Sequence, residues 1–304
     1  MPHGVIGRLA SPVMRLTKHH GLGNDFLVLL DRVGDQPIDA ALARALCDRH
    51  RGVGADGLMR AYRPRAGDDP GGDPPDAAME LLNADGSRAE MSGNGIRCLV
   101  QAMILDGWVD AKPDGAAQVV VGTDAGPRTV VVEKVLEPCT HLLTVDMGPV
   151  RFDSHGSNWV GGPFVRTAWA DMGNPHLVLE VDEGEDFDAI DLVGVGERIN
   201  AGTPAGTNVH LLRRSRSQDR IAIRTYERGV GPTQACGTGA CASAAVAHQW
   251  GLVGTRVGVD QPGGSVTVGL GATVQLTGTA TVIAAVEYPY TGPGAGHAVG
   301  PSGG

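Results

Sequence analysis

A short motif that occurs twice constrains this sequence more than any other feature. The first copy, S-G-N-G, begins at Ser92, and the second, C-G-T-G, begins at Cys236. Each copy leads into a run of small and apolar residues, which predicts a tightly packed helix. The two copies lie almost half of the 304-residue chain apart. Such an internal repeat predicts two related halves, each with one such helix.

The glycines of the repeated motif predict an anion-binding site. Glycine at a helix start lets backbone N–H groups approach a ligand closely, and the helix macrodipole adds about half a positive charge there. Two such helix starts that face each other across a cleft could clamp one carboxylate, with Ser92 and Cys236 beside the adjacent carbon. We expect the same field to lower the pKa of Cys236 below about 8.5. The alternative for Cys236 is a small buried apolar residue.

Composition limits what such a cleft can do. A chain of this length can bury a large core and divide into two domains. The net charge of −9 and the lack of a basic patch with aromatics argue against nucleic-acid binding. The sequence has no run of eighteen apolar residues and a poor signal peptide, so we expect a cytoplasmic protein without a membrane span. Five cysteines without zinc-ligand spacing predict reduced thiols and no metal site.

Two classes of cofactor are disfavoured by the sequence. Only three lysines occur, and none has a recognisable cofactor-binding context, which argues against a pyridoxal enzyme. The stretch 52–57 matches G-x-G-x-x-G, but it follows a predicted helix over 38–49 and leads into a strand. A dinucleotide fingerprint has the opposite order. The sequence therefore supports neither a pyridoxal cofactor nor a nicotinamide cofactor.

Other segments predict short strands and turns. A strand over 16–30 is broken by Gly21 and Gly23, and a hairpin is expected around 124–127. Further strands are expected over 78–88, 141–145, 176–179 and 221–226, and several antiparallel strands over 257–286. The crossing between halves is placed near 133–138. The predicted domains are 14–134 with a final strand at about 279–290, and 135–278, with disordered extensions at 1–13 and 291–304.

Four polar residues have both a functional and a structural interpretation. Asn24 lies at the break between two strands, where its amide could face a ligand or cap a turn. His176 begins an apolar strand, and a single histidine there is more often a structural group than a catalyst. The adjacent Glu227 and Arg228 could meet a ligand or form a surface pair of little energetic value.

Seven stretches of the sequence, in order along the chain, resemble diaminopimelate epimerase. They are H-G-L-G-N-D-F, N-A-D-G-S, S-G-N-G, G-N-P-H, G-T-N-V, Y-E-R-G-V-G and A-C-G-T-G, and they extend from about Lys18 to about Tyr290. The resemblance implies an α/β (α+β) fold of two pseudo-symmetric domains, each a curled, mostly antiparallel sheet or barrel around a central helix. It also implies cofactor-independent inversion of one α-carbon, from LL-diaminopimelate to the meso form, in lysine and cell-wall synthesis.

The resemblance also implies roles for particular residues. Ser92 and Cys236 would be the catalytic pair, with His176 and Glu227 beside them. For LL-diaminopimelate, Cys236 would accept the proton and Ser92 would donate one. The implied substrate contacts are Asn24, Asn83, Gly93, Asn94, Asn174, Asn208, Glu227, Arg228, Gly237 and Thr238. The implied partner is diaminopimelate alone, and a homodimer would be compatible with the family.

The sequence departs from the family pattern at Ser92, where the family has cysteine. A hydroxyl is a far weaker acid than a thiol, so we expect slow forward turnover and a larger loss in the reverse direction. Ser92 is compatible with an engineered substitution, with a natural slow epimerase, or with a paralogue such as the hydroxyproline dehydratases related to proline racemase. An inactive diaminopimelate-binding form is a further alternative. The asparagines and the Glu227–Arg228 pair favour diaminopimelate over proline.

Two further departures concern positions without an obvious role in the chemistry. Gly57 replaces a glutamine that some relatives use at the substrate. Pro232 replaces a common glutamate in the stretch after the Glu-Arg pair.

Overall fold

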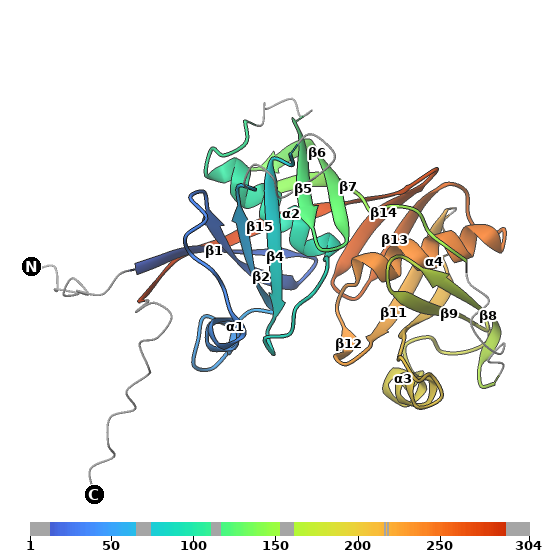
Figure 1. Ribbon diagram of the computed structural model, residues 1–304. Coiled ribbons are helices and arrows are strands. Elements are labelled where there is room, and N and C mark those ends of the chain that lie inside the picture. Colours follow the sequence, from blue (N-terminus) through green and yellow to red (C-terminus); the bar gives the residue numbers. More distant parts are fainter. Residues whose placement is uncertain are drawn as a thin grey trace, which may run out of the picture.

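The chain folds into two halves, each built around one long helix, in a computed structural model that describes residues 13–64, 74–110, 117–152, 161–215, 217 and 219–289. Helix α2 lies in the first half and helix α4 in the second (Figure 1). The predicted fold class is therefore confirmed. Apart from Val13, the predicted extensions at 1–13 and 291–304 lie outside the described residues.

The first half contains seven strands and two helices before the chain crosses to the second half. These elements are β1 (Val13–Gly21), β2 (Asn24–Asp31), α1 (Ala40–Cys47), β3 (Gly57–Tyr62), β4 (Ala77–Asn83), α2 (Gly93–Leu105), β5 (Ala117–Thr123), β6 (Gly126–Glu137) and β7 (Thr140–Asp146). Most of the strands and both helices match the segments expected from the sequence. The helix expected over 38–49 is shorter at both ends, and it begins after Asp39 because the carboxylate of this residue caps it by accepting from the Leu42 N–H at 2.8 Å.

The second half has the same order of elements with one extra short strand. Its elements are β8 (Phe164–Asp171), β9 (Pro175–Val181), α3 (Leu192–Ala201), β10 (Asn208–Arg214), β11 (Arg220–Glu227), β12 (Gly231–Thr233), α4 (Gly237–Gln249), β13 (Arg256–Gln261), β14 (Gly264–Leu270) and β15 (Val274–Pro289). Helix α3 is not among the elements expected from the sequence, and it begins where the Asp191 carboxylate accepts from the Gly194 N–H at 3.0 Å. Helices α1 and α3 lie on the outside of their halves (Figure 1).

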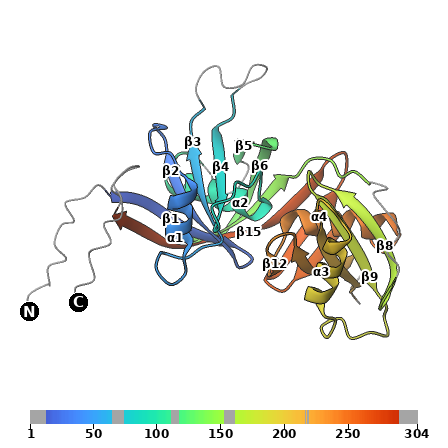
Figure 2. The ribbon, with the colours of Figure 1, turned by 60° about the horizontal axis from the view of Figure 1, so that its bottom comes forward.

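The strands of the first half close into an eight-stranded barrel. Strands β1 to β7 pair in sequence order, and β15 then pairs with both β7 and β1. Helix α2 is buried from Gly93 to Met103 and contacts β15, β1 and β2, so it fills the barrel (Figure 2). A helix that is apolar on all sides is stable only when it is enclosed in this way.

The second sheet continues the first through strand β15. Its order is β15, β14, β13, β11, β10, β9 and β8, and β12 pairs with the C-terminal end of β11. This sheet curls around α4, whose small alanine, cysteine and serine side chains are buried from Gly239 to Ala247. Strand β15 is 16 residues long. Its first part pairs with β14 of the second half and its last part pairs with β1 of the first half, so one strand runs through both sheets.

The chain crosses between the halves later than the sequence indicated. The stretch near 133–138 lies in strand β6, which continues to Glu137 and forms a hairpin with β7. Strand β7 in turn pairs with β15 and completes the first barrel. The crossing therefore follows Asp146, because the barrel needs β7 between β6 and β15 to close.

Candidate functional site

Helices α2 and α4 begin in the same way, at Ser92 and Cys236. Both residues have an extended backbone, and each side chain accepts a hydrogen bond from the N–H group three residues later. The Ser92 Oγ accepts from Gly95 at 3.0 Å, and the Cys236 Sγ accepts from Gly239 at 3.4 Å. The hydroxyl and the thiol thus occupy equivalent N-cap positions, one in each half.

The N-termini of the two helices meet at a pair of glycines. A Cβ atom added to Gly237 would lie 3.4 Å from the Cα of Gly93 and 3.1 Å from the Leu276 side chain of β15. A Cβ atom added to Gly93 would lie 2.9 Å from the same leucine. Glycine at both positions favours this close approach, and the two helix starts lie against each other, as the repeat led us to expect. The positive ends of two macrodipoles therefore converge on one point, as a carboxylate site requires.

The environment of Cys236 keeps its thiol protonated. Its backbone N–H donates to the Gln261 Oε1 at 2.8 Å, and its sulfur lies 3.6 Å from the Thr238 hydroxyl. Burial raises the pKa of the Cys236 thiol, and the neighbouring Glu227 carboxylate raises it further. The prediction that the helix field lowers this pKa was wrong for the ligand-free protein. Loss of hydration and a nearby negative charge outweigh the dipole.

Glu227 shares this environment with the thiol. Burial raises the pKa of the Glu227 carboxyl, although hydrogen bonds from the Thr233 hydroxyl, at 2.7 Å, and from the Cys236 thiol act in the opposite direction. Two weak acids in contact, each with a raised pKa, can exchange one proton between them. The arrangement therefore provides an acceptor for the thiol proton when Cys236 becomes a base.

We expect the reactivity of Cys236 towards iodoacetamide to rise with pH throughout the neutral and alkaline range. Only the thiolate reacts, and a raised thiol pKa means that the thiolate fraction is still small at neutral pH. In Glu227→Gln the neighbouring negative charge is gone, so the thiol pKa falls and the alkylation curve moves to lower pH. Peptide mass spectrometry at Cys236 measures this curve separately from the exposed Cys139.

A matched control for the alkylation experiment is Glu180→Gln. Glu180 is a carboxylate of the same half that pairs with Arg166 and has no contact with the thiol. This substitution should leave the alkylation curve of Cys236 unchanged. An unchanged curve in Glu227→Gln as well would show that the carboxylate does not set the acidity of Cys236.

A network of hydrogen bonds holds two predicted substrate contacts on the Ser92 side. The Asn94 amide donates to the Asn24 Oδ1 at 3.3 Å, and the Asn24 amide donates to the Asp56 Oδ2 at 2.8 Å. The guanidinium of Arg97 donates to the Asn94 Oδ1 at 2.6 Å. Asn24 and Asn94 therefore lie together at the start of α2, with both amide orientations fixed by their neighbours.

On the other side, His176 belongs to a buried chain of polar side chains. Its Nε2 lies 2.8 Å from the Asn174 Oδ1 and its Nδ1 lies 2.8 Å from the His210 Nε2, while the His210 Nδ1 lies 2.9 Å from the Thr225 hydroxyl. Burial, followed by repulsion from His210, lowers the pKa of His176 well below its usual value, so the ring is neutral. The ring orients the Asn174 amide. Its placement beside a catalytic side chain stays a prediction.

Two side chains of the site were not identified from the sequence. His210 packs against the first turn of α4, since a Cβ atom on Gly239 would lie 2.2 Å from its ring. Gln261 holds the backbone of Cys236, as described above. A single histidine or glutamine in a strand carries no local signal of such a role, so only the tertiary structure reveals it.

Three further predicted contacts, Asn83, Asn208 and Arg228, form hydrogen bonds with neighbouring groups of the protein. The Asn208 Oδ1 accepts from the Arg228 N–H at 3.1 Å, and its amide donates to the Pro175 carbonyl at 3.1 Å. The Arg228 guanidinium donates to the Ala205 carbonyl at 2.7 Å and is exposed. Asn83, at the end of β4, is also exposed and donates to the Ser87 hydroxyl at 3.0 Å. Asn83 and Arg228 are accessible to a ligand, whereas the Asn208 side chain is bonded to backbone groups of the protein.

A direct contact between the halves lies near Asn24. Leu22, in the turn between β1 and β2, has a φ of 56°. A Cβ atom on Gly263 would lie 2.1 Å from the Leu22 carbonyl, and the Gly263 N–H donates to the Gln234 carbonyl at 2.8 Å. Only glycine can occupy this position at the turn between β13 and β14. The contact connects the Asn24 strand with the segment that leads to Cys236.

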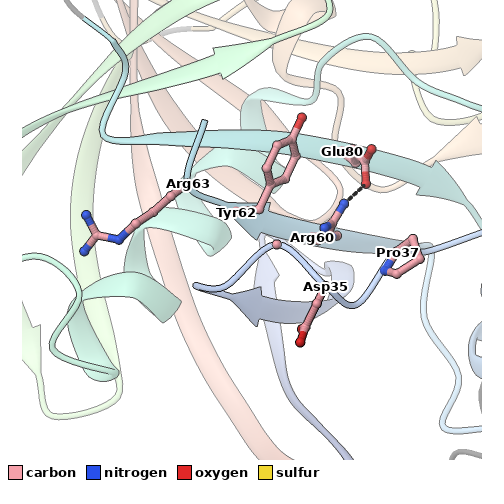
Figure 3. Close-up of a pocket in the computed structure, with 7 residues that line it drawn as sticks. Asp35, Pro37, Arg60, Tyr62, Arg63 and Glu80 are labelled. Atoms are coloured by element: carbon pink, nitrogen blue, oxygen red, sulfur yellow. Dashed lines mark hydrogen bonds and ion pairs between the residues drawn. The ribbon is translucent and has the colours of Figure 1, made fainter. Parts of the chain in front are cut away.

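A surface pocket on the first half is separate from this site. Figure 3 shows that Arg60 and Tyr62 of β3 and Glu80 of β4 line it, together with residues of the loop after β2. None of the predicted site residues lines this pocket. Within the described ranges, no group of three or more His, Cys, Asp or Glu side chains is placed to hold a metal ion, and no helix is long and apolar enough to cross a membrane.

Comparison with known proteins identifies the family. The family model of diaminopimelate epimerase matches residues 16–152 and 168–283. The chain belongs to the diaminopimelate epimerase family. It is 41% identical over 281 residues to the diaminopimelate epimerase of Thermobifida fusca, covering 89% of this chain and 96% of that protein. It is 37% identical over 292 residues to the diaminopimelate epimerase of Prochlorococcus marinus, covering 89% and 91%. Family membership makes the chain an isomerase of the epimerase type.

Solved structures of more distant proteins share the fold. A hydroxyproline epimerase from Agrobacterium vitis superposes with a TM-score of 0.69 at 18% identity, covering 94% of this chain and 95% of that one. A phenazine biosynthesis protein of the PhzF family from Bacillus anthracis gives a TM-score of 0.65 at 14% identity, covering 91% and 99%. At these identities the similarity concerns the fold alone. The fold of two related halves is therefore common to proteins well beyond this family.

Proposed function

We propose that this protein inverts one α-carbon of LL-2,6-diaminopimelate to give meso-diaminopimelate, without a cofactor. The observation that carries the proposal is the meeting of two helix N-termini at Gly93 and Gly237, with Ser92 and Cys236 at the two N-caps. One carboxylate fits this double positive end, and the two side chains lie on either side of it. The identities of 35 to 41% to diaminopimelate epimerases over most of the chain support the substrate.

The reaction needs a base on one face of the α-carbon and an acid on the other. Glu227 accepts the thiol proton of Cys236, and the resulting thiolate removes the α-proton. The electron pair of the broken C–H bond moves into the carboxylate, which becomes an enediolate. The backbone N–H groups after Gly93 and Gly237 and the two helix dipoles stabilise this charge, because they already point at the place where it develops.

Ser92 completes the inversion by giving its hydroxyl proton to the opposite face. This step forms the new C–H bond and leaves an alkoxide, which regains a proton from solvent when the product leaves. Because a serine hydroxyl is a weak acid, we propose that protonation by Ser92 is the slowest step. The N-cap hydrogen bond from Gly95 to the Ser92 Oγ stabilises the alkoxide to some degree.

Incubation with LL-diaminopimelate in D₂O tests the proposed function. We expect meso product that carries one α-deuterium, because the new proton comes from solvent through Ser92. Nuclear magnetic resonance measures the deuterium, and chiral chromatography measures the stereochemistry. The control is Cys139→Ser, which removes the exposed cysteine and should leave the rate unchanged.

Other outcomes would identify the alternatives. Binding of diaminopimelate without deuterium or inversion would mean that Ser92 makes this protein an inactive binding form. Turnover of proline or hydroxyproline, without any action on diaminopimelate, would mean that the protein is a paralogue with another substrate. A cytoplasmic location and a homodimer are part of the proposal, and the second is measured by light scattering in solution.

A further inference from the structure

Arg97 is fully buried and has no carboxylate partner among the described residues. Its Nη1 donates to the Gly93 carbonyl at 3.0 Å, its Nη2 to the Asn94 Oδ1 at 2.6 Å, and its Nε to the Thr279 carbonyl at 3.4 Å. All three acceptors are neutral. A buried cation without an anionic partner is unfavourable and therefore needs an explanation.

Two glycines of neighbouring strands leave room for this guanidinium. A Cβ atom on Gly21 of β1 would lie 3.3 Å from the Arg97 Nη2, and one on Gly278 of β15 would lie 3.1 Å from its Cζ. These two strands pair with each other at the back of α2. Both glycines keep the sheet backbone close to the guanidinium, so the position of Arg97 is fixed from the helix and from the sheet.

A second buried arginine in the same half shows the usual arrangement. Arg60 of β3 pairs with Asp31 at 2.7 Å and with Glu80 at 2.9 Å, and Figure 3 shows the second of these contacts. Its charge is compensated inside the protein. Both arginines are buried, so burial does not explain why Arg60 has carboxylate partners and Arg97 has none. The missing partner of Arg97 can be an anionic group of a bound ligand.

Arg97 remains charged in its buried position. Burial lowers the pKa of the guanidinium to about 10, which is still well above neutral pH, and the groups that act on its charge are the thiols of Cys98 and Cys241. The guanidinium is bonded to Gly93, the first residue of α2, and it lies about one helical turn from the N-terminus. Its charge thus adds to the positive end of the macrodipole instead of cancelling it.

We propose that Arg97 is a positioning residue whose fixed charge makes the α-carboxylate of the bound ligand its counter-ion. This inference rests on the proposed function. Arg97 also holds the Asn94 Oδ1, so that the Asn94 amide is directed towards Asn24. When the carboxylate becomes an enediolate, its negative charge increases, and the attraction to Arg97 increases with it. Arg97 therefore favours the transition state without touching the substrate.

Thermal unfolding with and without meso-diaminopimelate tests this inference on Arg97→Met, with Arg60→Met as the matched control. Arg97→Met removes an uncompensated charge, so we expect a melting temperature no lower than that of the wild type but little stabilisation by the ligand. Arg60→Met leaves Asp31 buried and unpaired, so its melting temperature should fall while stabilisation by the ligand is kept.

Kinetics give a second readout. Arg97→Met should lower kcat/KM by about 10- to 100-fold, the effect of a unit charge at about one helical turn in a medium of moderate dielectric constant. Arg97→Lys keeps the charge, so it should recover part of this loss even if its hydrogen bonds differ. If Arg97→Met does not fold, kcat/KM of Arg97→Lys is compared with that of Arg97→Gln, because these two variants differ in charge.

Two results would overturn the inference. The first is an Arg97→Met protein that melts at a lower temperature than the wild type and is stabilised by the ligand to the full extent. The second is equal kcat/KM for Arg97→Lys and Arg97→Gln. A wild-type protein that neither binds nor turns over diaminopimelate would instead contradict the proposed function, and the same Arg97 variants would then be compared with the amino acid that the wild type does bind.

Discussion

Cys236→Ala should lower kcat/KM for epimerisation by about 10³-fold, which is the scale of a general base in a proton transfer. Alanine removes the only group at the α4 N-cap that can accept the α-proton. The glycine contact between Gly93 and Gly237 and the backbone N–H groups of the carboxylate site stay in place. We therefore expect binding of meso-diaminopimelate to be kept while α-deuterium incorporation is lost.

Cys241→Ala is the control for this experiment. Cys241 lies on the same helix and is equally buried, but it points into the core and has no contact with Glu227 in the described structure. Both substitutions remove one buried thiol. Cys236→Ala also loses the N-cap bond to Gly239, which costs about 1 kcal/mol of stability. If Cys236→Ala kept turnover within tenfold of the wild type, another group would have to be the base.

The local part of the site could be predicted from the sequence because its signals are local. Glycines directly after Ser92 and Cys236, followed by apolar runs, indicate two helix starts whatever the rest of the chain does. The repeat then implies that the two helix starts occupy equivalent places in the two halves and can lie together where the halves meet. The contact between Gly93 and Gly237 confirms this inference at the level of single atoms.

The parts that sequence analysis missed depend on contacts between distant segments. The acidity of Cys236 is set by burial and by Glu227 of strand β11, so the helix dipole alone predicted the wrong direction. Strand β7 looked like the start of the second half, but its two neighbours in the sheet place it in the first barrel. Helix α3 contains two glycines in ten residues, which weakens its helical pattern, and it forms because its apolar face packs on the sheet.

Arg97 shows a different limit of sequence analysis. An arginine in an apolar helix would be expected to face a carboxylate, and its sequence neighbours give no other indication. Only the tertiary structure shows that backbone glycines of β1 and β15, and not acidic side chains, lie next to its guanidinium. Strand β15 also joins the two halves, so one strand contributes both to the site of this charge and to the connection between the halves.

Ser92→Cys should raise kcat/KM by about 10²-fold, because it replaces a weak acid by a thiol at the face that receives the new proton. The substitution fits the structure, since Cys236 already shows a cysteine at the equivalent N-cap, with its sulfur 3.4 Å from a backbone nitrogen. The equilibrium between the two stereoisomers is a property of the substrate. The gain in kcat/KM must therefore be the same in both directions.

The difference between the two directions that Ser92 is expected to cause appears in the deuterium isotope effects instead of in kcat/KM. If protonation by Ser92 is the slowest step, the C–D bond of an α-deuterated LL substrate is already broken before that step, so the forward reaction shows a small isotope effect. The reverse reaction, in which the Ser92 alkoxide breaks the C–D bond of the meso substrate, shows a large one. In Ser92→Cys the two effects should become similar, because thiols act on both faces. Equal isotope effects in the wild type, or no gain in Ser92→Cys, would mean that Ser92 does not carry the proton.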